Sequence, residues 1–137
     1  MEFEEAKKEL KSYQSMEKAI EQMQAWVDDK KYNSNKLTST ISSQPRGSPI
    51  HQDGMAENIS KAIDLESDVQ ERINEMKLKQ KEILRKVLQL EQPFQNVIFS
   101  IYIVGNTIDA SASIVGFSRI ETYRKRDKAI ELYMQIK

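Results

Sequence analysis

The feature that most constrains this chain is a heptad pattern within residues 57–92. Ten positions follow one another at alternating spacings of three and four, and eight of them are apolar. These positions are Ile59, Ala62, Glu66, Val69, Ile73, Met76, Gln80, Ile83, Val87 and Leu90. Such spacing places the side chains along one seam of an α-helix. We therefore predict a long helix that ends near Pro93, because proline cannot continue a helix.

A helix of this length must pack against another helix. At about 1.5 Å per residue it would be about 50 Å long, too long for the small globule that such a chain could form. Its partner is either an earlier helix of the same chain or a second copy, in a homodimer. Polar Glu66 and Gln80 are of the kind that sets register or oligomer state. The candidate oligomerisation residues are Ile59, Val69, Ile73, Met76, Ile83 and Val87.

Residues 2–33 carry a second apolar stripe and predict the partner helix. The stripe consists of Phe3, Ala6, Leu10, Tyr13, Met16, Ile20, Met23 and Val27. Between the two helices, residues 34–56 are rich in Ser, Thr, Asn, Pro and Gly. This composition predicts a flexible linker, which is either mobile or packed along the helices through Ile41 and Ile50. Residues 1–92 are thus predicted to form a long helical hairpin of the coiled-coil kind.

Residues 93–137 are predicted to hold three shorter helices. The first is apolar and covers residues 93–104, the second covers 107–115, and the last begins at Ser118. Thr107 and Ser118 are residue types that cap helix N-termini, because a side-chain oxygen there accepts a backbone N–H bond.

The last two predicted helices are joined by a tight turn at Gly116. Ser118 and Glu121 have the spacing of a capping box, and Phe117 and Ile120 are expected to reach the shared core. Two short helices joined by such a turn form a helix-turn-helix, whose second helix lies in the major groove of DNA. The predicted fold is all-α, with a long N-terminal hairpin followed by a small helix-turn-helix domain.

Charge gives the DNA prediction local support. The chain has 21 basic and 21 acidic residues, so its net charge is zero. Residues 118–137, however, carry six basic and three acidic residues. This excess favours phosphate contacts, although basic residues also suit the C-terminal end of any helix. The candidate DNA-binding residues are Thr107, Ser118, Arg119, Thr122, Tyr123, Arg124, Lys125, Arg126 and Lys128.

Helical spacing divides these candidates into two groups. Arg119 and Tyr123 lie four residues apart on one face, and Arg126 follows at the next step. Arg124 and Lys128 lie to one side, where a phosphate strand would run. We expect Arg119 to read a base and the flanking cations to contact the backbone. Tyr123 could equally be half-buried packing, and an interior position is favoured for Thr122 over a contact with DNA.

Several motifs carry a resemblance to known regulators. They are AENISKAIDLESDVQERI at 56–73, LEQP at 90–93, YIVGNT at 102–107, YR at 123–124 and DKAI at 127–130. With them, residues 88–137 resemble the region-four-type helix-turn-helix of bacterial sigma factors. The whole chain resembles the ArpU/RinA-like phage transcriptional regulators of Gram-positive bacteria, most strongly from Ile59 onward.

The resemblance implies a prophage- or mobile-element-encoded regulator of late or packaging genes that acts on promoter DNA. In such a regulator, the N-terminal hairpin would serve oligomerisation or contact with host RNA polymerase. Ser111, Thr122 and Lys125 stand where the family usually has large aliphatic residues. Either the recognition helix is rotated slightly, or the core of the domain is weak.

Other classes of function find little support in the sequence. There is no cysteine and one histidine, His51, so a thiol nucleophile is excluded and a histidine-based triad or metal site is disfavoured. No glycine-rich phosphate loop is present. We expect no enzymatic activity, no catalytic or metal-binding residue and no cofactor.

No stretch approaches the roughly 20 apolar residues of a membrane span, and the charged N-terminus lacks the apolar segment of a signal peptide. We therefore expect a cytoplasmic protein that makes no membrane contact. The alternative to a DNA-binding regulator is a coiled-coil interaction module. In that case, the C-terminal helices would dock a protein, such as RNA polymerase, rather than double-stranded DNA.

Overall fold

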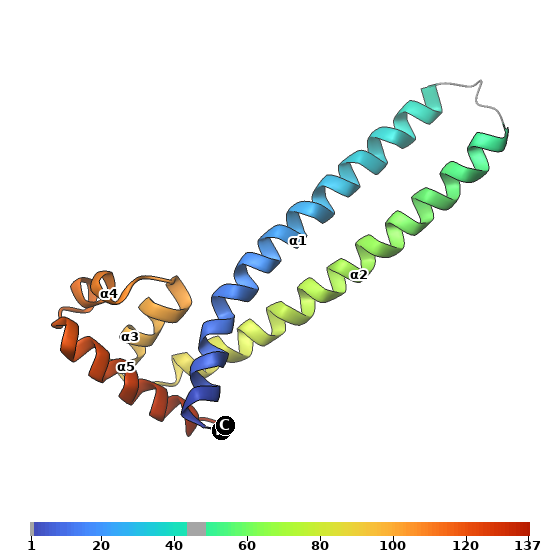
Figure 1. Ribbon diagram of the computed structural model, residues 1–137. Coiled ribbons are helices and arrows are strands. Elements are labelled where there is room, and N and C mark those ends of the chain that lie inside the picture. The colour runs from blue at the N-terminus through green and yellow to red at the C-terminus, as the bar shows by residue number, and fades with distance from the viewer. Residues whose placement is uncertain (1, 44–48) are drawn as a thin grey trace. The chain divides into compact units, whose positions relative to one another are not determined.

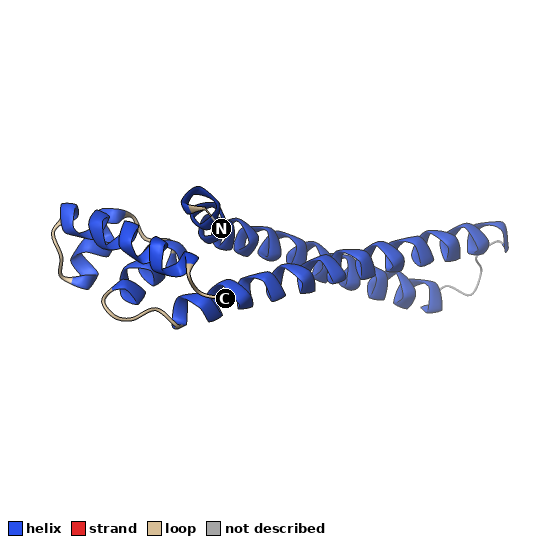
Figure 2. Ribbon diagram, turned by 90° about the horizontal axis from the view of Figure 1, so that it is seen from below, coloured by secondary structure: helices blue, strands red, loops and turns tan. Residues whose placement is uncertain are grey.

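The structure, a computed structural model, describes residues 2–43 and 49–137, and the side chains of residues 2–32 and 64–137. The described residues form helices and the turns between them, without a strand (Figures 1 and 2). The helices are α1 (Phe3–Ser43), α2 (Pro49–Leu88), α3 (Phe94–Ile98), the π-helical η1 (Phe99–Val104), α4 (Ile108–Val115) and α5 (Arg119–Met134). The predicted all-α class is confirmed.

The chain divides into two compact units. Unit 1 comprises residues 1–18 and 77–137, and unit 2 comprises residues 19–76. This division differs from the boundary predicted at residue 93. The first turns of α1 and the last turns of α2 belong with the C-terminal helices, because they share one apolar core.

Unit 2 is built from the parts of α1 and α2 that run side by side in both ribbon views (Figures 1 and 2). The predicted seam accounts for its interior. Ile20 and Val27 of α1 are buried, as are Ile73 and Met76 of α2, whereas Val69 is half-buried. Heptad spacing is therefore confirmed as the pattern that places the apolar side chains of this unit inside.

The helices extend well into the segment predicted as a linker at 34–56. α1 continues to Ser43 and α2 begins at Pro49, so the prediction is wrong for most of the segment. Ser, Thr and Asn cost a helix less than about 1 kcal/mol per residue, and proline is favoured at a first helical position. Residues 44–48 lie outside the described part of the chain. The same holds for the side chains of Ile41, Ile50, His51, Ile59 and Ala62.

The two polar positions of the seam are satisfied differently. In unit 1, the Gln80 amide donates to the carbonyl of Tyr13 at 3.2 Å and to Glu17 Oε2 at 2.8 Å. In unit 2, Glu66 is buried, and its Oε1 has no hydrogen-bond partner among the described residues. A buried polar atom without a partner is costly, so Glu66 is a weak point of the hairpin.

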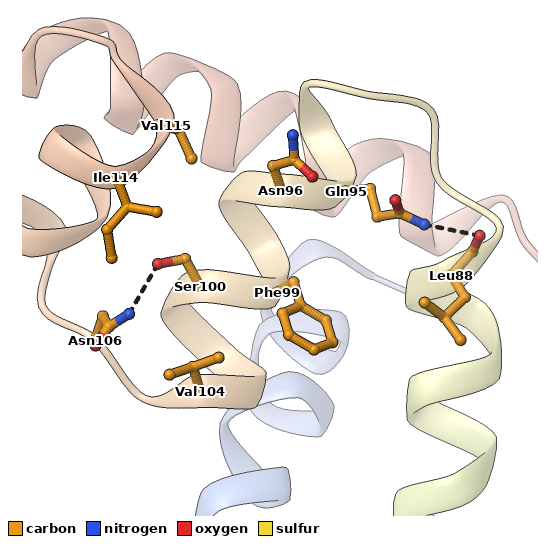
Figure 3. A pocket seen from close by; sticks show the side chains of 9 residues that line it. All are labelled: Leu88, Gln95, Asn96, Phe99, Ser100, Val104, Asn106, Ile114 and Val115. Carbon is orange, nitrogen blue, oxygen red and sulfur yellow. Dashed lines mark hydrogen bonds between the residues drawn. The ribbon is translucent and has the colours of Figure 1, made fainter.

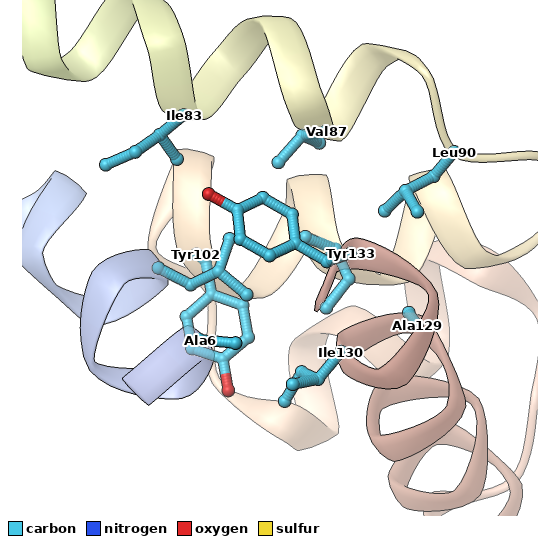
Figure 4. Close-up of a cluster of buried hydrophobic side chains, with 10 residues drawn as sticks. Ala6, Ile83, Val87, Leu90, Tyr102, Ala129, Ile130 and Tyr133 are labelled. Atoms are coloured by element: carbon cyan, nitrogen blue, oxygen red, sulfur yellow. The ribbon is translucent and has the colours of Figure 1, made fainter. Parts of the chain in front are cut away.

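The core of unit 1 is assembled from α1, α2, η1, α3 and α5 together (Figure 4). Its buried members are Ala6, Leu10, Ile83, Val87, Leu90, Ile98, Tyr102, Ala129, Ile130 and Tyr133. The Tyr133 ring lies beneath α2, close to Ile83 and Val87, as Figure 4 shows. The C-terminal helices thus bury their apolar faces against the base of the hairpin.

A polar group completes this core. The Tyr133 hydroxyl donates to Glu9 Oε2 at 2.9 Å, and Lys86 Nζ lies 3.6 Å from the same oxygen. Burial raises the pKa of Tyr133 far above its usual value, and the hydrogen bond to Glu9 raises it further. Tyr133 therefore remains a neutral donor, which ties α5 to α1 and, through Lys86, to α2.

Candidate nucleic-acid interface

The three C-terminal helices predicted from the sequence are present. α3 and η1 together cover the first, which changes from α- to π-helical at Phe99. The predicted N-caps are confirmed for the other two. Thr107 Oγ1 accepts the N–H of Ala110 at 3.2 Å, and Ser118 Oγ accepts the N–H of Glu121 at 3.2 Å. These bonds fix where α4 and α5 begin.

Residues 116–118 connect α4 to α5. Gly116 has a φ of +82°, a left-handed conformation that glycine adopts without strain. Its N–H and that of Phe117 both bond the carbonyl of Ala112, at 2.9 and 3.1 Å, which closes the end of α4. Ala112 itself is buried, as expected for a small residue between two helices. The turn therefore positions the first residues of α5 relative to α4.

Two buried hydroxyl residues lie inside this helical group. Ser111 Oγ is 2.8 Å from Ser100 Oγ, which also accepts from Asn106 Nδ2 at 3.1 Å. Thr122 Oγ1 donates to the carbonyl of Ser118 at 2.8 Å, and its residue is 0% exposed. Thr122 is therefore removed from the candidate DNA contacts, and the interior position favoured from the sequence is the one observed.

Arg119, Tyr123 and Arg126 form one cluster on α5, which we call the Arg119 cluster. The guanidinium carbons of Arg119 and Arg126 lie 6.0 and 5.0 Å from the centre of the Tyr123 ring. The predicted common face is thus confirmed. Arg126 is bonded to Asp127 at 2.9 Å with a side chain only 18% exposed, so it supports the ring more than it faces solvent.

Arg119 is held from a second side by α4. Its Nε lies 3.4 Å from Asp109 Oδ1, in an exposed ion pair. A hydrogen bond with Tyr123, followed by the charge of Asp109, raises the pKa of Arg119 further above its already high value. Arg119 therefore stays charged, and its exposed side chain at the start of α5 lies beside both Asp109 and the Tyr123 ring.

Arg124 and Lys128 of α5 are exposed. Arg124 Nη1 is 3.8 Å from Glu121 Oε2, and Lys128 Nζ is 3.7 Å from Glu131 Oε2. Exposed ion pairs of this kind contribute about 0–1 kcal/mol, so a phosphate could replace the carboxylate at little cost.

Lys125 departs from the predicted role of a DNA contact. Its ammonium group lies 5.4 Å from the ring centre of Phe94 and 5.9 Å from that of Phe117, with Glu121 Oε1 at 3.5 Å. The side chain is only 30% exposed. An ammonium group over the face of an aromatic ring is attracted by the ring's charge distribution. Lys125 is therefore held between two rings and Glu121, and only part of its side chain reaches solvent.

The core position predicted for Ile120 is wrong. Ile120 is 66% exposed in the first turn of α5, between Arg119 and Arg124. Phe117, by contrast, is half-buried. The signal that could have located Ile120 is its helical position, two residues before the buried Thr122 and therefore on the opposite side.

A second surface of unit 1 was also missed (Figure 3). It is an open groove of about 640 Å³ lined by Leu88, Gln95, Asn96, Phe99, Ser100, Val104, Asn106, Ile114 and Val115. None of these residues is charged, and the side chains of Leu88, Phe99, Val104 and Ile114 are exposed. The apolar run at 97–104 is longer than one buried helix face requires, which was the available signal.

The described residues were also compared with what a metal site and a membrane span require. No group of three or more His, Cys, Asp or Glu in this part of the chain is placed to hold a metal ion. Across the described ranges, no helix is both long and apolar enough to cross a membrane. Comparison of the chain with family models, curated proteins and solved structures found no match.

Proposed function

We propose that the chain binds double-stranded DNA through α4 and α5, with the first turns of α5 in the major groove. The observation that carries this proposal is the exposed Arg119 at the start of a helix whose N-terminus is capped by Ser118. In a helix-turn-helix, the N-terminal residues of the second helix contact base edges. An arginine at that place can bond guanine O6 and N7 together.

Other side chains of α5 suit roles different from the base contact proposed for Arg119. Arg124 and Lys128 lie on the exposed flank and suit contacts to phosphate, which give affinity without sequence preference. Tyr123 holds Arg119 at a distance of 6.0 Å from the ring centre and so limits the directions in which Arg119 can point. Restricting a side chain before binding lowers the entropy lost on binding.

We further propose that this DNA-binding unit belongs to a transcriptional regulator of the phage or mobile-element kind. The support is the resemblance described above, which implies promoter DNA as target and control of late or packaging genes. Host RNA polymerase is proposed as a partner of the helical hairpin, and a cytoplasmic location is proposed from the sequence pattern. A homodimer would place two α5 helices on a two-fold symmetric operator.

The proposal is tested by selecting sites from a random duplex DNA pool. The wild-type chain should enrich a defined sequence, and Arg119→Ala should relax the preference at one position by about 1–3 kcal/mol. Arg72→Ala serves as the control, since Arg72 is an exposed arginine of α2 in an ion pair with Glu75. Recovery of the unselected pool by the wild-type chain would refute the proposal.

A second function is favoured by the uncharged groove beside η1. Exposed apolar side chains gathered in one groove are typical of protein-docking surfaces. In this alternative, the groove receives an apolar segment of a protein such as RNA polymerase. Val104→Glu would place a charge in the groove and should weaken binding to purified bacterial RNA polymerase, with DNA binding unchanged. Equal binding by Val104→Glu and the wild-type chain would exclude this role.

A further inference from the structure

The most exposed apolar side chain of α5 lies beside the residue proposed to read DNA. Ile120 is 66% exposed, and it is flanked in the sequence by Arg119 and Glu121. An isolated exposed isoleucine needs no explanation on an ordinary surface. Here, however, it occupies the second position of the helix proposed to enter the major groove. Any duplex that reaches Arg119 would also cover Ile120.

We propose that Ile120 is a specificity residue that packs against the C5-methyl group of a thymine. The thymine would lie next to the guanine read by Arg119, so the preferred DNA would contain neighbouring G·C and T·A pairs. This inference rests on the proposed function and adds to it the identity of a second base pair. Thymine presents the methyl group at the floor of the major groove, where an apolar side chain can cover it.

Arg119 and Ile120 occupy the first two positions of α5, at the end of the helix proposed to enter the groove. Successive side chains of a helix point about 100° apart, so the two residues face different base pairs rather than the same one. Both are exposed, and the N-terminal residues of such a helix contact base edges.

The neighbours of Ile120 favour an apolar base feature over a polar one. Ile120 has no hydrogen-bonding group, and the exposed Arg124 follows it one helical turn later, toward the proposed phosphate strand. Covering Ile120 with the amino group of cytosine or adenine would leave that group without a partner, which is costly. Covering it with a thymine methyl removes apolar surface of both partners from water.

The test replaces thymine by deoxyuridine, which lacks only the methyl group, at each thymine of the selected site in turn. At one position, the wild-type chain should lose about fourfold in affinity, the value expected for one buried methyl group. Ile120→Ala should bind the thymine and deoxyuridine duplexes alike, and Ile120→Val should keep part of the difference. Circular dichroism verifies that both variants fold, which is expected because the side chain is exposed.

Ile114→Ala is the matched control. Ile114 is also 66% exposed but lies near the end of α4 and lines the groove beside η1, so it should retain the wild-type fourfold difference. A selected site at which no thymine can be replaced with loss of affinity overturns the inference, as does a full methyl effect in Ile120→Ala. Both results leave the proposed function standing. Failure of the wild-type chain to select any site refutes the proposed function itself.

Discussion

Polar side chains of α4 and α5 are satisfied inside a small helical group. Ser111 is bonded to Ser100, and Thr122 to the carbonyl of Ser118, so neither hydroxyl is buried alone. The ammonium group of Lys125 lies over the rings of Phe94 and Phe117. Each of these side chains supports the position of α5 and leaves its outer face to Arg119 and Arg124.

Loss of the cap on α5 should weaken both folding and DNA binding. Ser118→Ala removes the acceptor for the Glu121 N–H and should lower the free energy of unfolding by about 1 kcal/mol. Ser118→Asp, which restores an acceptor, should recover most of the loss. Urea denaturation followed by circular dichroism measures the free energy of unfolding of the wild-type chain and of both variants. Equal stability of all three chains would mean that the cap does not fix the helix start.

Removal of the carboxylate beside Arg119 should strengthen DNA binding. Asp109→Asn eliminates a negative charge 3.4 Å from Arg119, so that the arginine is no longer shared between Asp109 and the DNA. Because the ion pair is exposed and screened by solvent, we expect a modest gain in affinity. Fluorescence anisotropy with a labelled duplex measures the change. Unaltered affinity would indicate that Arg119 does not meet DNA.

At the scale of elements, heptad spacing predicted which faces of α1 and α2 are buried, because burial in a helix pair follows from position on the seam. The ends of these helices could not be predicted equally well. Residues 34–43 and 49–56 have a composition typical of loops, yet they extend helices that are already nucleated. The change to a π-helix at η1 was not predicted, since the apolar run at 97–104 fits either kind of helix.

The two polar seam positions should respond differently to replacement by leucine. Glu66→Leu removes a buried oxygen that has no partner among the described residues, so it should stabilise the chain by about 1 kcal/mol or more. Gln80→Leu removes two hydrogen bonds, to Tyr13 and Glu17, and should give no such gain. Thermal denaturation compares the two variants. Stabilisation by Gln80→Leu and not by Glu66→Leu would contradict the assignment of the hydrogen bonds.

At the scale of the whole molecule, the sequence predicts a boundary at residue 93 between the hairpin and the C-terminal helices. In the structure, the contacts instead join the C-terminal helices with parts of α1 and α2 in one unit. Motifs and caps report local structure, whereas the division into units depends on which apolar faces meet across the chain. Tyr133 illustrates this, since its hydroxyl bonds Glu9, which lies more than a hundred residues earlier. The position of Arg119 was predictable from helical spacing, but its contact with Asp109 depends on the turn between α4 and α5.

The C-terminal helices should therefore not fold alone. A peptide of residues 93–137 exposes Ile98, Tyr102 and Tyr133, because their partners on α1 and α2 are missing. It should show low helicity and no cooperative melting by circular dichroism. A chain in which a short Gly/Ser segment replaces residues 19–76 keeps the core of unit 1 and should melt cooperatively. A cooperative transition in the peptide would show that residues 93–137 are a domain of their own.

The central claim, that the flank of α5 contacts phosphate, is tested most directly by the salt dependence of DNA binding. Because the chain has no net charge, a steep dependence must come from a local basic surface. The measurement is the slope of log K against log salt concentration for the wild-type chain, Arg124→Ala and Arg72→Ala. Arg124 and Arg72 are both exposed arginines paired with a glutamate three residues away.

We predict a clear negative slope for the wild-type chain, reduced by about one unit in Arg124→Ala. The slope of Arg72→Ala should equal that of the wild-type chain. A wild-type slope near zero, or an equal reduction by both variants, would contradict binding of DNA through α5.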